Sequence, residues 1–292
     1  MFAGFKSRKI QANGRRIFCR TGGAGPPLLL LHGHPQTHVI WHKVADKLAE
    51  QFSVVAADLR GYGDSEKPGY SPHAQNYAKR VMALDQLELM QALGHDTFSI
   101  LAHDRGARVA HRLAADAPSS VERMLLLDIA PTLAMYRQTN EAFARAYWHW
   151  FFLIRPAPLP ESLIEADPGR YLEAVMEARS SGLAVFSREA LSEYRRCLAL
   201  PGTATGICED YRASAGIDLT HDQEDINDGR SVRCPIRILW GQDGTVGQCF
   251  EPLKEWRKVA SDVSGKALPC GHYIPEELPA ELLAEAIGFF VS

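Results

Sequence analysis

The chain has 292 residues, of which 46% are hydrophobic and 23% are charged, and its formal net charge at pH 7 is −3. These values are typical of a globular protein with a substantial core, built as one large domain or two smaller ones. The slightly acidic balance, without any run of five basic residues, argues against a nucleic-acid partner.

The N-terminal residues lack the apolar stretch of a secretory signal, and the longest apolar runs are too short to cross a bilayer. We therefore expect neither secretion nor a membrane partner. The six cysteines are scattered and include no C-x-x-C pair. This usage is typical of reduced thiols in a cytoplasmic protein rather than of a disulfide framework or a zinc site.

Short apolar runs alternate with helix-like segments along much of the chain. Asn13-Gly14 separates the runs 9–12 and 16–19 and predicts a hairpin. Further strands are predicted at 28–31, 54–57, 98–101, 124–127 and 236–240, and helices at 44–51, 77–93 and 280–290. This alternation predicts an α/β fold with a mostly parallel sheet and helices on both faces.

The alternation stops between Asp128 and Cys234. This stretch is rich in proline and aromatic residues, and its periodicity predicts helices at 141–154, 171–180 and 188–198. We interpret residues 132–228 as a helical cap domain inserted over the strand ends. Residues 1–131 and 229–292 would form the core domain. In such sheets, functional groups gather beyond the carboxyl ends of the strands.

Ala102-His103-Asp104-Arg105-Gly106 lies between a predicted strand and a predicted helix. Small residues two positions before and after the centre permit the sharp turn of a nucleophile elbow. Serine is the usual central residue, but Asp104 stands here. A carboxylate is already charged at neutral pH, so it can attack carbon without a base and form an ester, which water must then hydrolyse.

Ester hydrolysis would need a base and donors for the oxyanion. His272, before the last predicted helix, is the candidate base, and Asp128, after the strand that follows the elbow, would orient it. The backbone N–H groups of Arg105 and His34 would form the oxyanion hole.

Two arginines follow the candidate nucleophile. Arg105 and Arg108 are three positions apart at the start of a helix, so both side chains can lie on one side of it. Guanidinium groups suit carboxylates. His32 and His34 lack an accompanying cluster of other metal ligands, so we expect no metal site.

With these motifs the chain resembles the α/β-hydrolase superfamily over nearly its whole length. Haloalkane dehalogenases and epoxide hydrolases also have Asp at the elbow, but His103-Asp104-Arg105-Gly106-Ala107-Arg108 resembles the haloacetate dehalogenases, including those acting on fluoroacetate. The resemblance implies that Arg105 and Arg108 bind the substrate carboxylate. It also implies a homodimer and catalysis without a cofactor.

The segment 144–150 is similar to the cap motif of that family. The resemblance implies that His149, Trp150 and Tyr211 stabilise the departing halide, and each can donate an N–H or O–H. Fluoride leaves with difficulty but accepts hydrogen bonds strongly, so its departure would need several fixed donors.

The chain departs from the family at two places. His34 stands where an apolar residue is usual, and no tryptophan lies within 151–239, where 176–179 replaces a mid-cap Trp. We expect the loss of this Trp to leave room in the pocket. Asp243, after the strand at 236–240, is a rival to Asp128, which the resemblance favours.

These features predict hydrolysis of a 2-halo carboxylate, such as chloroacetate or fluoroacetate, to a 2-hydroxy acid and halide. One alternative is an epoxide hydrolase, in which Tyr211, with Tyr136 or Tyr147, would protonate the opening ring. Another is a non-catalytic binder of small carboxylates, which would use the arginines and tolerate loss of Asp104.

Overall fold

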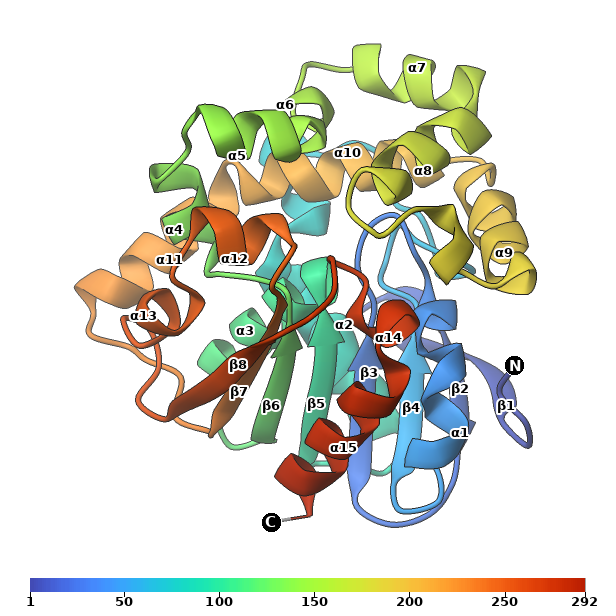
Figure 1. The fold of residues 1–292 in the computed structure, drawn as a ribbon, viewed down its shortest axis with the longest axis vertical. Coiled ribbons are helices and arrows are strands. Elements are labelled where there is room, and N and C mark those ends of the chain that lie inside the picture. Colours follow the sequence, from blue (N-terminus) through green and yellow to red (C-terminus); the bar gives the residue numbers. More distant parts are fainter. Residues whose placement is uncertain (292) are drawn as a thin grey trace.

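The computed structural model describes residues 1–291, in which eight strands form one sheet in the order β1-β2-β4-β3-β5-β6-β7-β8 (Figure 1). The β1–β2 and β2–β4 pairs are antiparallel, and the remaining pairs are parallel. The strands are β1 (Lys6–Ala12), β2 (Arg15–Gly22), β3 (Pro27–Leu31), β4 (Ser53–Ala57), β5 (Phe98–His103), β6 (Val121–Leu127), β7 (Ile236–Gly241) and β8 (Val263–Leu268). The predicted α/β class is confirmed.

The local sequence accounts for most of these strands. Asn13 and Gly14 both have positive φ, 47° and 70°, as a tight hairpin turn requires. The leucines of β3 are fully buried because both faces of the central sheet are covered. Strand β8 was missed by the sequence analysis, since this edge strand is mostly exposed and carries no apolar run.

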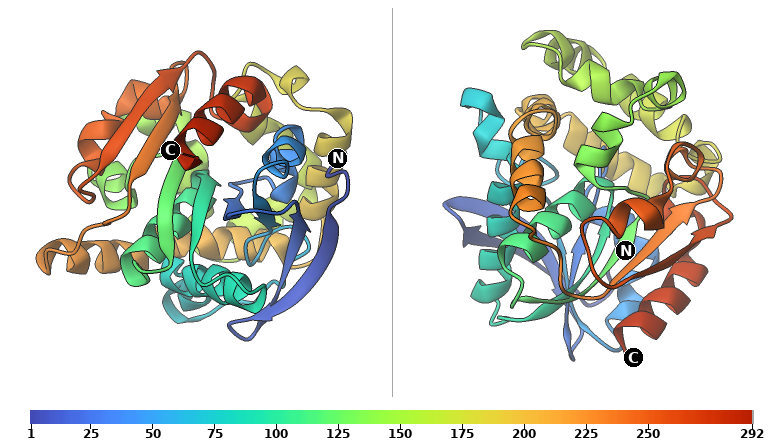
Figure 2. Two further views of the ribbon diagram at one scale, coloured as in Figure 1. Left: turned by 90° about the horizontal axis from the view of Figure 1, so that it is seen from below. Right: turned by 90° about the vertical axis from the view of Figure 1, so that its left-hand side faces the viewer.

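Helices cover both faces of the sheet (Figure 2). On one face, α2 (Lys79–Ala92) and α3 (Asp104–Asp116) pack in a cluster that includes Leu29 and Leu126. On the other, α1 (Ala45–Leu48) and α15 (Pro279–Phe290) pack in a cluster that includes Leu30 and Leu125. Shorter helices lie in the connections: η1 (His38–Lys43), η2 (Pro72–Tyr77), α12 (Thr245–Cys249), α13 (Pro252–Trp256) and α14 (Ile274–Glu277).

The segment between β6 and β7 is helical and lies beyond the carboxyl ends of the strands (Figure 1). Its helices are α4 (Thr132–Arg137), α5 (Glu141–Ala146), α6 (Trp148–Leu153), α7 (Leu159–Ala166), α8 (Pro168–Glu177), η3 (Leu183–Val185), α9 (Arg188–Leu198), α10 (Thr203–Ser214) and α11 (Ile217–Asn227). We propose that residues 132–228 are the cap domain. Within residues 1–291, no helix is both long enough and apolar enough to cross a lipid bilayer.

The prediction of one helix over 141–154 was wrong. The helix breaks at Tyr147, whose φ and ψ are −106° and 37°. On a continuous helix, adjacent side chains diverge by about 100°. The break lies directly before His149 and Trp150, which are both buried, while Trp148 is 37% exposed.

The central sheet should carry much of the stability. Leu126 is fully buried in β6, so Leu126→Ala should lower the free energy of unfolding by about 2–5 kcal/mol through lost burial and a residual cavity. Leu84 in α2 is 41% exposed, and Leu84→Ala should change it by less than about 0.5 kcal/mol. Urea unfolding checks both, and equal losses would contradict this description of the core.

Candidate active site

Asp104 directly follows β5 as the first residue of α3 and has a strained backbone conformation. Its φ is 47°, in a region that residues with a side chain seldom adopt. The turn brings α3 close to the end of β3: the Gly106 N–H donates to His32 O at 2.9 Å, and a Cβ on Gly106 would lie 2.5 Å from that oxygen. Gly106, one of the small residues of the predicted elbow, is therefore required because the backbone at His32 lies too close for a side chain.

His272 lies between two carboxylates. Its Nε2 is 3.7 Å from Asp104 Oδ2, and its Nδ1 is 2.5 Å from Asp128 Oδ2. Asp128, just beyond β6 with φ 50°, is also held by the Gly241 N–H, which donates to Oδ1 at 2.9 Å. The rival Asp243 lies in the turn after β7, where its N–H donates to Cys270 O at 3.1 Å. The carboxylate in contact with the His272 ring is thus that of Asp128.

The two oxygens of Asp104 have different surroundings. The His34 N–H donates to Oδ1 at 2.8 Å, whereas Oδ2 faces His272 and Arg179. The Arg105 backbone N–H directly follows Asp104 at the first turn of α3. Oδ1 is therefore in the position of an oxyanion next to one backbone donor, the His34 N–H, and Oδ2 is the oxygen that remains to attack. The Arg105 N–H stays a predicted second donor.

Burial and nearby charges set the protonation of these groups. Burial alone would raise the pKa of Asp104, but Arg179 and other nearby positive charges hold it well below its ordinary value. Burial, and next the Arg179 charge, lower the pKa of His272 well below 6.5. Burial raises the pKa of Asp128, but both of its oxygens accept hydrogen bonds, Oδ1 from the Gly241 N–H and Oδ2 from His272 Nδ1, as those of a carboxylate do. Near pH 7, Asp104 is therefore ionised and the His272 ring is neutral, with Nδ1 donating to Asp128.

Most of the Arg105 guanidinium is bound to Asp210 of α10. Its Nε donates to Asp210 Oδ2 and its Nη2 to Oδ1, both at 2.8 Å, and Nη2 also donates to Ser214 Oγ at 2.6 Å. Of the three nitrogens of this guanidinium, Nη1 is the one that is buried without a hydrogen-bond partner among the described residues. Arg105 thus joins the core to the cap helices and retains one nitrogen for another acceptor.

Arg108 has no carboxylate partner within residues 1–291. Its Nη1 donates to Thr132 Oγ1 at 2.8 Å, and its guanidinium carbon lies 4.7 Å from the centre of the Trp150 ring. Its Nε is buried without a partner in the described structure. The positive charge of this side chain is therefore not compensated by a bonded anion.

His149, Trp150 and Tyr211 lie close together. The centre of the Tyr211 ring lies 5.9 Å from the centre of the His149 ring and 6.2 Å from that of the Trp150 ring. His149 Nε2, Trp150 Nε1 and Tyr211 Oη are all buried and have no hydrogen-bond partner in residues 1–291. Buried polar groups are seldom unpaired, so three such donors together are suited to an acceptor that binds there.

His34, the polar substitution noted in the sequence, joins this group. Its Nε2 lies 3.0 Å from Tyr171 Oη, and its ring stacks on that of His149 at 6.0 Å. Burial lowers the pKa of His34 to about 3. His34 therefore adds a neutral polar ring beside the nucleophile.

The sequence analysis missed Arg179 as a site residue. Its Nη2 lies 3.4 Å from Asp104 Oδ2 and also contacts His272 Nε2, and its Nη1 donates to His34 O at 3.3 Å. Arg179 belongs to segment 176–179, which replaces the mid-cap Trp, and its guanidinium contacts Asp104. The expectation that the missing Trp leaves room stays a prediction. Segment 176–179 was noted, but an arginine at a helix end is usually solvated.

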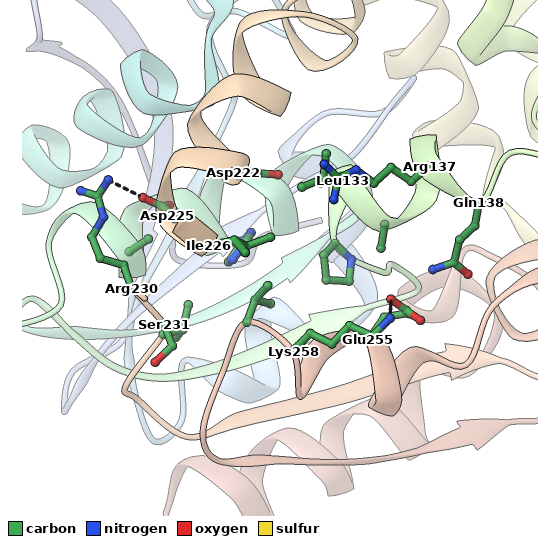
Figure 3. Close-up of a pocket in the computed structure, with 16 residues that line it drawn as sticks. Leu133, Arg137, Gln138, Asp222, Asp225, Ile226, Arg230, Ser231, Glu255 and Lys258 are labelled. Carbon is green, nitrogen blue, oxygen red and sulfur yellow. Dashed lines mark hydrogen bonds and ion pairs between the residues drawn. The ribbon is translucent and has the colours of Figure 1, made fainter. Parts of the chain in front are cut away.

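Two small cavities differ in their relation to the site. One, of about 90 Å³, is lined by Tyr147, Arg179, Asp243 and His272, so Arg179 and His272 connect it to Asp104. Another, of about 140 Å³, lies between α4, α11 and α13 and is bordered by the Arg230–Asp225 and Lys258–Glu255 ion pairs (Figure 3). The residues that line this second cavity include none of the predicted site residues.

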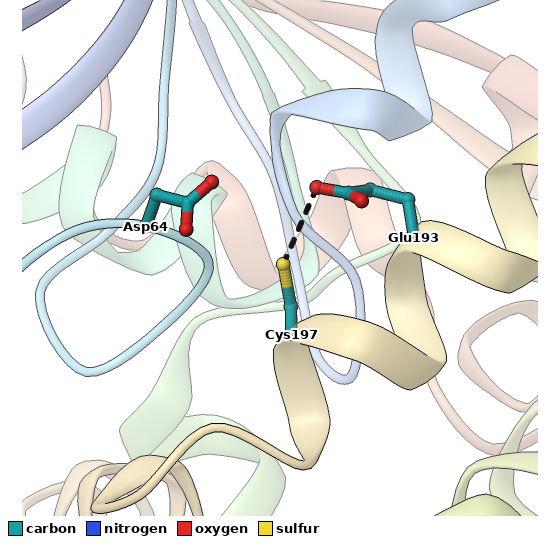
Figure 4. A group of neighbouring side chains, drawn as sticks. All are labelled: Asp64, Glu193 and Cys197. Atoms are coloured by element: carbon teal, nitrogen blue, oxygen red, sulfur yellow. Dashed lines mark hydrogen bonds between the residues drawn. The ribbon is translucent and has the colours of Figure 1, made fainter.

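Asp64, Glu193 and Cys197 also lie near one another, with ligand atoms within 4.8 Å (Figure 4). Arg196 donates to Asp64 Oδ2 at 2.7 Å and to Glu193 Oε1 at 2.6 Å. The two carboxylates are therefore already compensated by a bound guanidinium.

Comparisons with known proteins agree with this geometry. The family model described as "alpha/beta hydrolase fold" matches residues 26–179. The chain is 43% identical to the fluoroacetate dehalogenase of Burkholderia sp., covering 99% of this chain and 95% of the relative. This chain belongs to the α/β-hydrolase superfamily, in the family of that dehalogenase. The predicted family is confirmed.

Other relatives widen the range of reactions. The soluble epoxide hydrolase of Corynebacterium sp. strain C12 is 36% identical, over 95% of this chain and 94% of the relative. The crystal structure of ALR0039 from Nostoc sp. PCC 7120 superposes with a TM-score of 0.97 at 51% identity, covering 99% of each chain. The structure of epoxide hydrolase CorEH has a TM-score of 0.90 at 33% identity, covering 98% of this chain and 99% of CorEH. The chain is thus a hydrolase whose substrate is not decided by likeness alone.

The protonation of His272 can be tested without a substrate. Because its pKa is lowered below 6.5, NMR of ring-labelled protein should show a mainly neutral imidazole at about pH 6. The signal is assigned by its loss in His272→Ala. A ring that is half protonated or more at that pH would contradict the electrostatics described above.

Proposed function

We propose that this protein is a hydrolytic dehalogenase that converts 2-halo carboxylates, such as chloroacetate or fluoroacetate, to 2-hydroxy acids and halide. The observation that carries the proposal is an ionised carboxylate, Asp104, in a buried site that also holds three unpaired donors and uncompensated positive charge. An acidic molecule with an electronegative leaving group suits this combination. The 43% identity to a fluoroacetate dehalogenase supports it.

In the first step, Asp104 Oδ2 attacks the α-carbon of the substrate. A C–O bond forms, the carbon–halogen bond breaks, and its electron pair leaves with the halide. Arg105 Nη1 and Arg108 Nε would bind the substrate carboxylate, since each is a buried guanidinium nitrogen without a partner in the described structure. His149, Trp150 and Tyr211 would donate to the halide.

In the second step, water attacks the carbonyl carbon of the Asp104 ester. His272 Nε2 accepts a proton from that water, and Asp128 stabilises the imidazolium through Nδ1. Negative charge develops on Oδ1, beside the His34 N–H at 2.8 Å. As the tetrahedral intermediate collapses, the His272 imidazolium returns its proton to the leaving alkoxide oxygen and the 2-hydroxy acid is released. Asp104, which now holds one oxygen from water, loses its proton to solvent and is again a carboxylate. The residues involved require no cofactor for these steps.

Epoxide hydrolysis is the second candidate, and Tyr211 favours it. Its hydroxyl is buried, unpaired in residues 1–291 and protonated, because burial raises its pKa well above 10. A phenol in this state can donate a proton to an opening ring. The 36% identity to a soluble epoxide hydrolase supports this candidate. An epoxide, however, carries no anionic group for the arginines.

Product analysis separates the candidates. The protein is incubated with fluoroacetate, chloroacetate and styrene oxide, and free halide and diol are measured. Halide with glycolate from either halo acid, at least about 100-fold faster than diol formation, is expected because only the acids carry a carboxylate for the guanidinium groups. Diol without halide would replace the dehalogenase proposal with the epoxide hydrolase. If neither halide nor diol forms, a non-catalytic binder of small carboxylates would be favoured.

The covalent intermediate gives a second test. In His272→Asn, the ester should form but hydrolyse at least about 1,000-fold more slowly, because no base activates water. Mass spectrometry after addition of chloroacetate should locate a carboxymethyl group on Asp104, and Asp104→Asn is the matched control. Unmodified Asp104 together with stoichiometric halide release by His272→Asn would reject this mechanism.

A further inference from the structure

One set of charged groups near Asp104 is made of cations and anions that bind each other. Arg105 is paired with Asp210. Lys79 contacts Asp210 as well and lies 3.4 Å from Asp218 Oδ2. These two cations and two anions compensate one another, and all four side chains are buried. This set therefore contributes no net charge to the site.

The remaining charged groups are Arg108, Arg179, Asp104 and Asp128. Asp128 is bound to the His272 ring. Arg179 lies 3.4 Å from Asp104 Oδ2, whereas Arg108 has no bonded anion among the described residues. Arg179 and Asp104 therefore compensate each other, and the charge of Arg108 is available for an arriving anion. Without Arg179, the charge of Asp104 would oppose that anion.

A substrate acid adds a second negative charge beside Asp104. Two carboxylates in a buried site repel each other strongly unless each has its own cation. Arg179 compensates Asp104, at 3.4 Å, and thereby leaves Arg108 and the free nitrogen of Arg105 for the arriving anion.

We propose that Arg179 is a specificity-determining residue: it compensates the charge of Asp104 so that an anionic substrate can approach the nucleophile. The role of the bound acid as a substrate rests on the proposed function, but the anion preference itself does not. Arg179 acts on substrate choice through Asp104, because an anionic substrate adds a second negative charge beside this carboxylate and a neutral substrate does not.

Several contacts hold Arg179 in this position. Its guanidinium carbon lies 5.2 Å from the centre of the Tyr147 ring and 5.4 Å from that of Tyr273, so aromatic faces support the cation. The His272 N–H donates to Arg179 O at 2.9 Å. A Cβ on Gly271 would lie 2.9 Å from this oxygen, so the glycine permits the close approach. The arginine and the histidine loop are therefore fixed together.

The charge count predicts an order of anion affinities. Acetate, an unreactive analogue of a haloacetate, is titrated into four proteins at constant ionic strength, and the Trp150 indole N–H signal is followed by NMR. Acetate should bind most tightly to Asp104→Asn and most weakly to Arg179→Met, with a difference of about 30-fold or more. The wild type and the double variant should fall between them and agree within about threefold, because their site charges are equal.

Loss of structure alone would not produce this order. If removal of the Asp104 charge in the double variant fails to restore the acetate affinity lost in Arg179→Met, the proposal is overturned. Arg179→Lys, which keeps the charge, should retain affinity within about tenfold of the wild type. Thermal unfolding of every variant verifies that each is folded.

Turnover gives the matching kinetic result. Chloroacetate and chloroacetamide share a leaving group but differ in charge. Arg179→Met should lower kcat/KM for chloroacetate at least about tenfold more than that for chloroacetamide, because both substrates lose the contact of Arg179 with Asp104 but only the acid adds a second negative charge. Equal losses on both would overturn the specificity role. If the wild type releases no halide at all, the proposed function fails, while the acetate titration still decides the role of Arg179.

Discussion

The site depends on keeping one negative charge, that of Asp104, inside the protein at a sharp turn of the backbone. A carboxylate buried to this degree would ordinarily become protonated. Here the His34 N–H, the Arg179 guanidinium and the nearby histidines stabilise the ionised form. The strained φ of 47° is tolerated because β5 and α3 are fixed by the two hydrophobic clusters on either side of the sheet.

The cap helices and the core are connected by buried polar contacts as well as by apolar packing. Asp210 in α10 binds Arg105 in α3, and Tyr194 in α9 donates to Glu276 Oε1 of α14 at 2.7 Å. Groups of this kind are costly to separate, because each would leave a buried charge or donor without a partner. The donor that α10 contributes, Tyr211, is thereby held at a fixed position in the site. This rigidity is what electrostatic stabilisation of a leaving group requires.

Sequence reasoning succeeded where a local pattern determines the outcome. The apolar run at 28–31, the Asn13-Gly14 turn and the small residues around Asp104 each have few structural solutions. It failed where the answer depends on contacts between distant segments. Nothing local indicates that Arg179 faces Asp104 rather than solvent, or that Asp210 binds Arg105, since these pairs are far apart in sequence. The break at Tyr147 was missed because a stripe of apolar residues continues through it.

The central claim is that Asp104 attacks carbon and is later released by water. A single turnover of chloroacetate in ¹⁸O-labelled water, with enzyme in excess, tests this most directly. If Asp104 forms an ester, its carboxylate takes up the label and the glycolate produced remains unlabelled. Labelled glycolate with an unlabelled Asp104 would show that water displaces the halide itself, and would contradict the account.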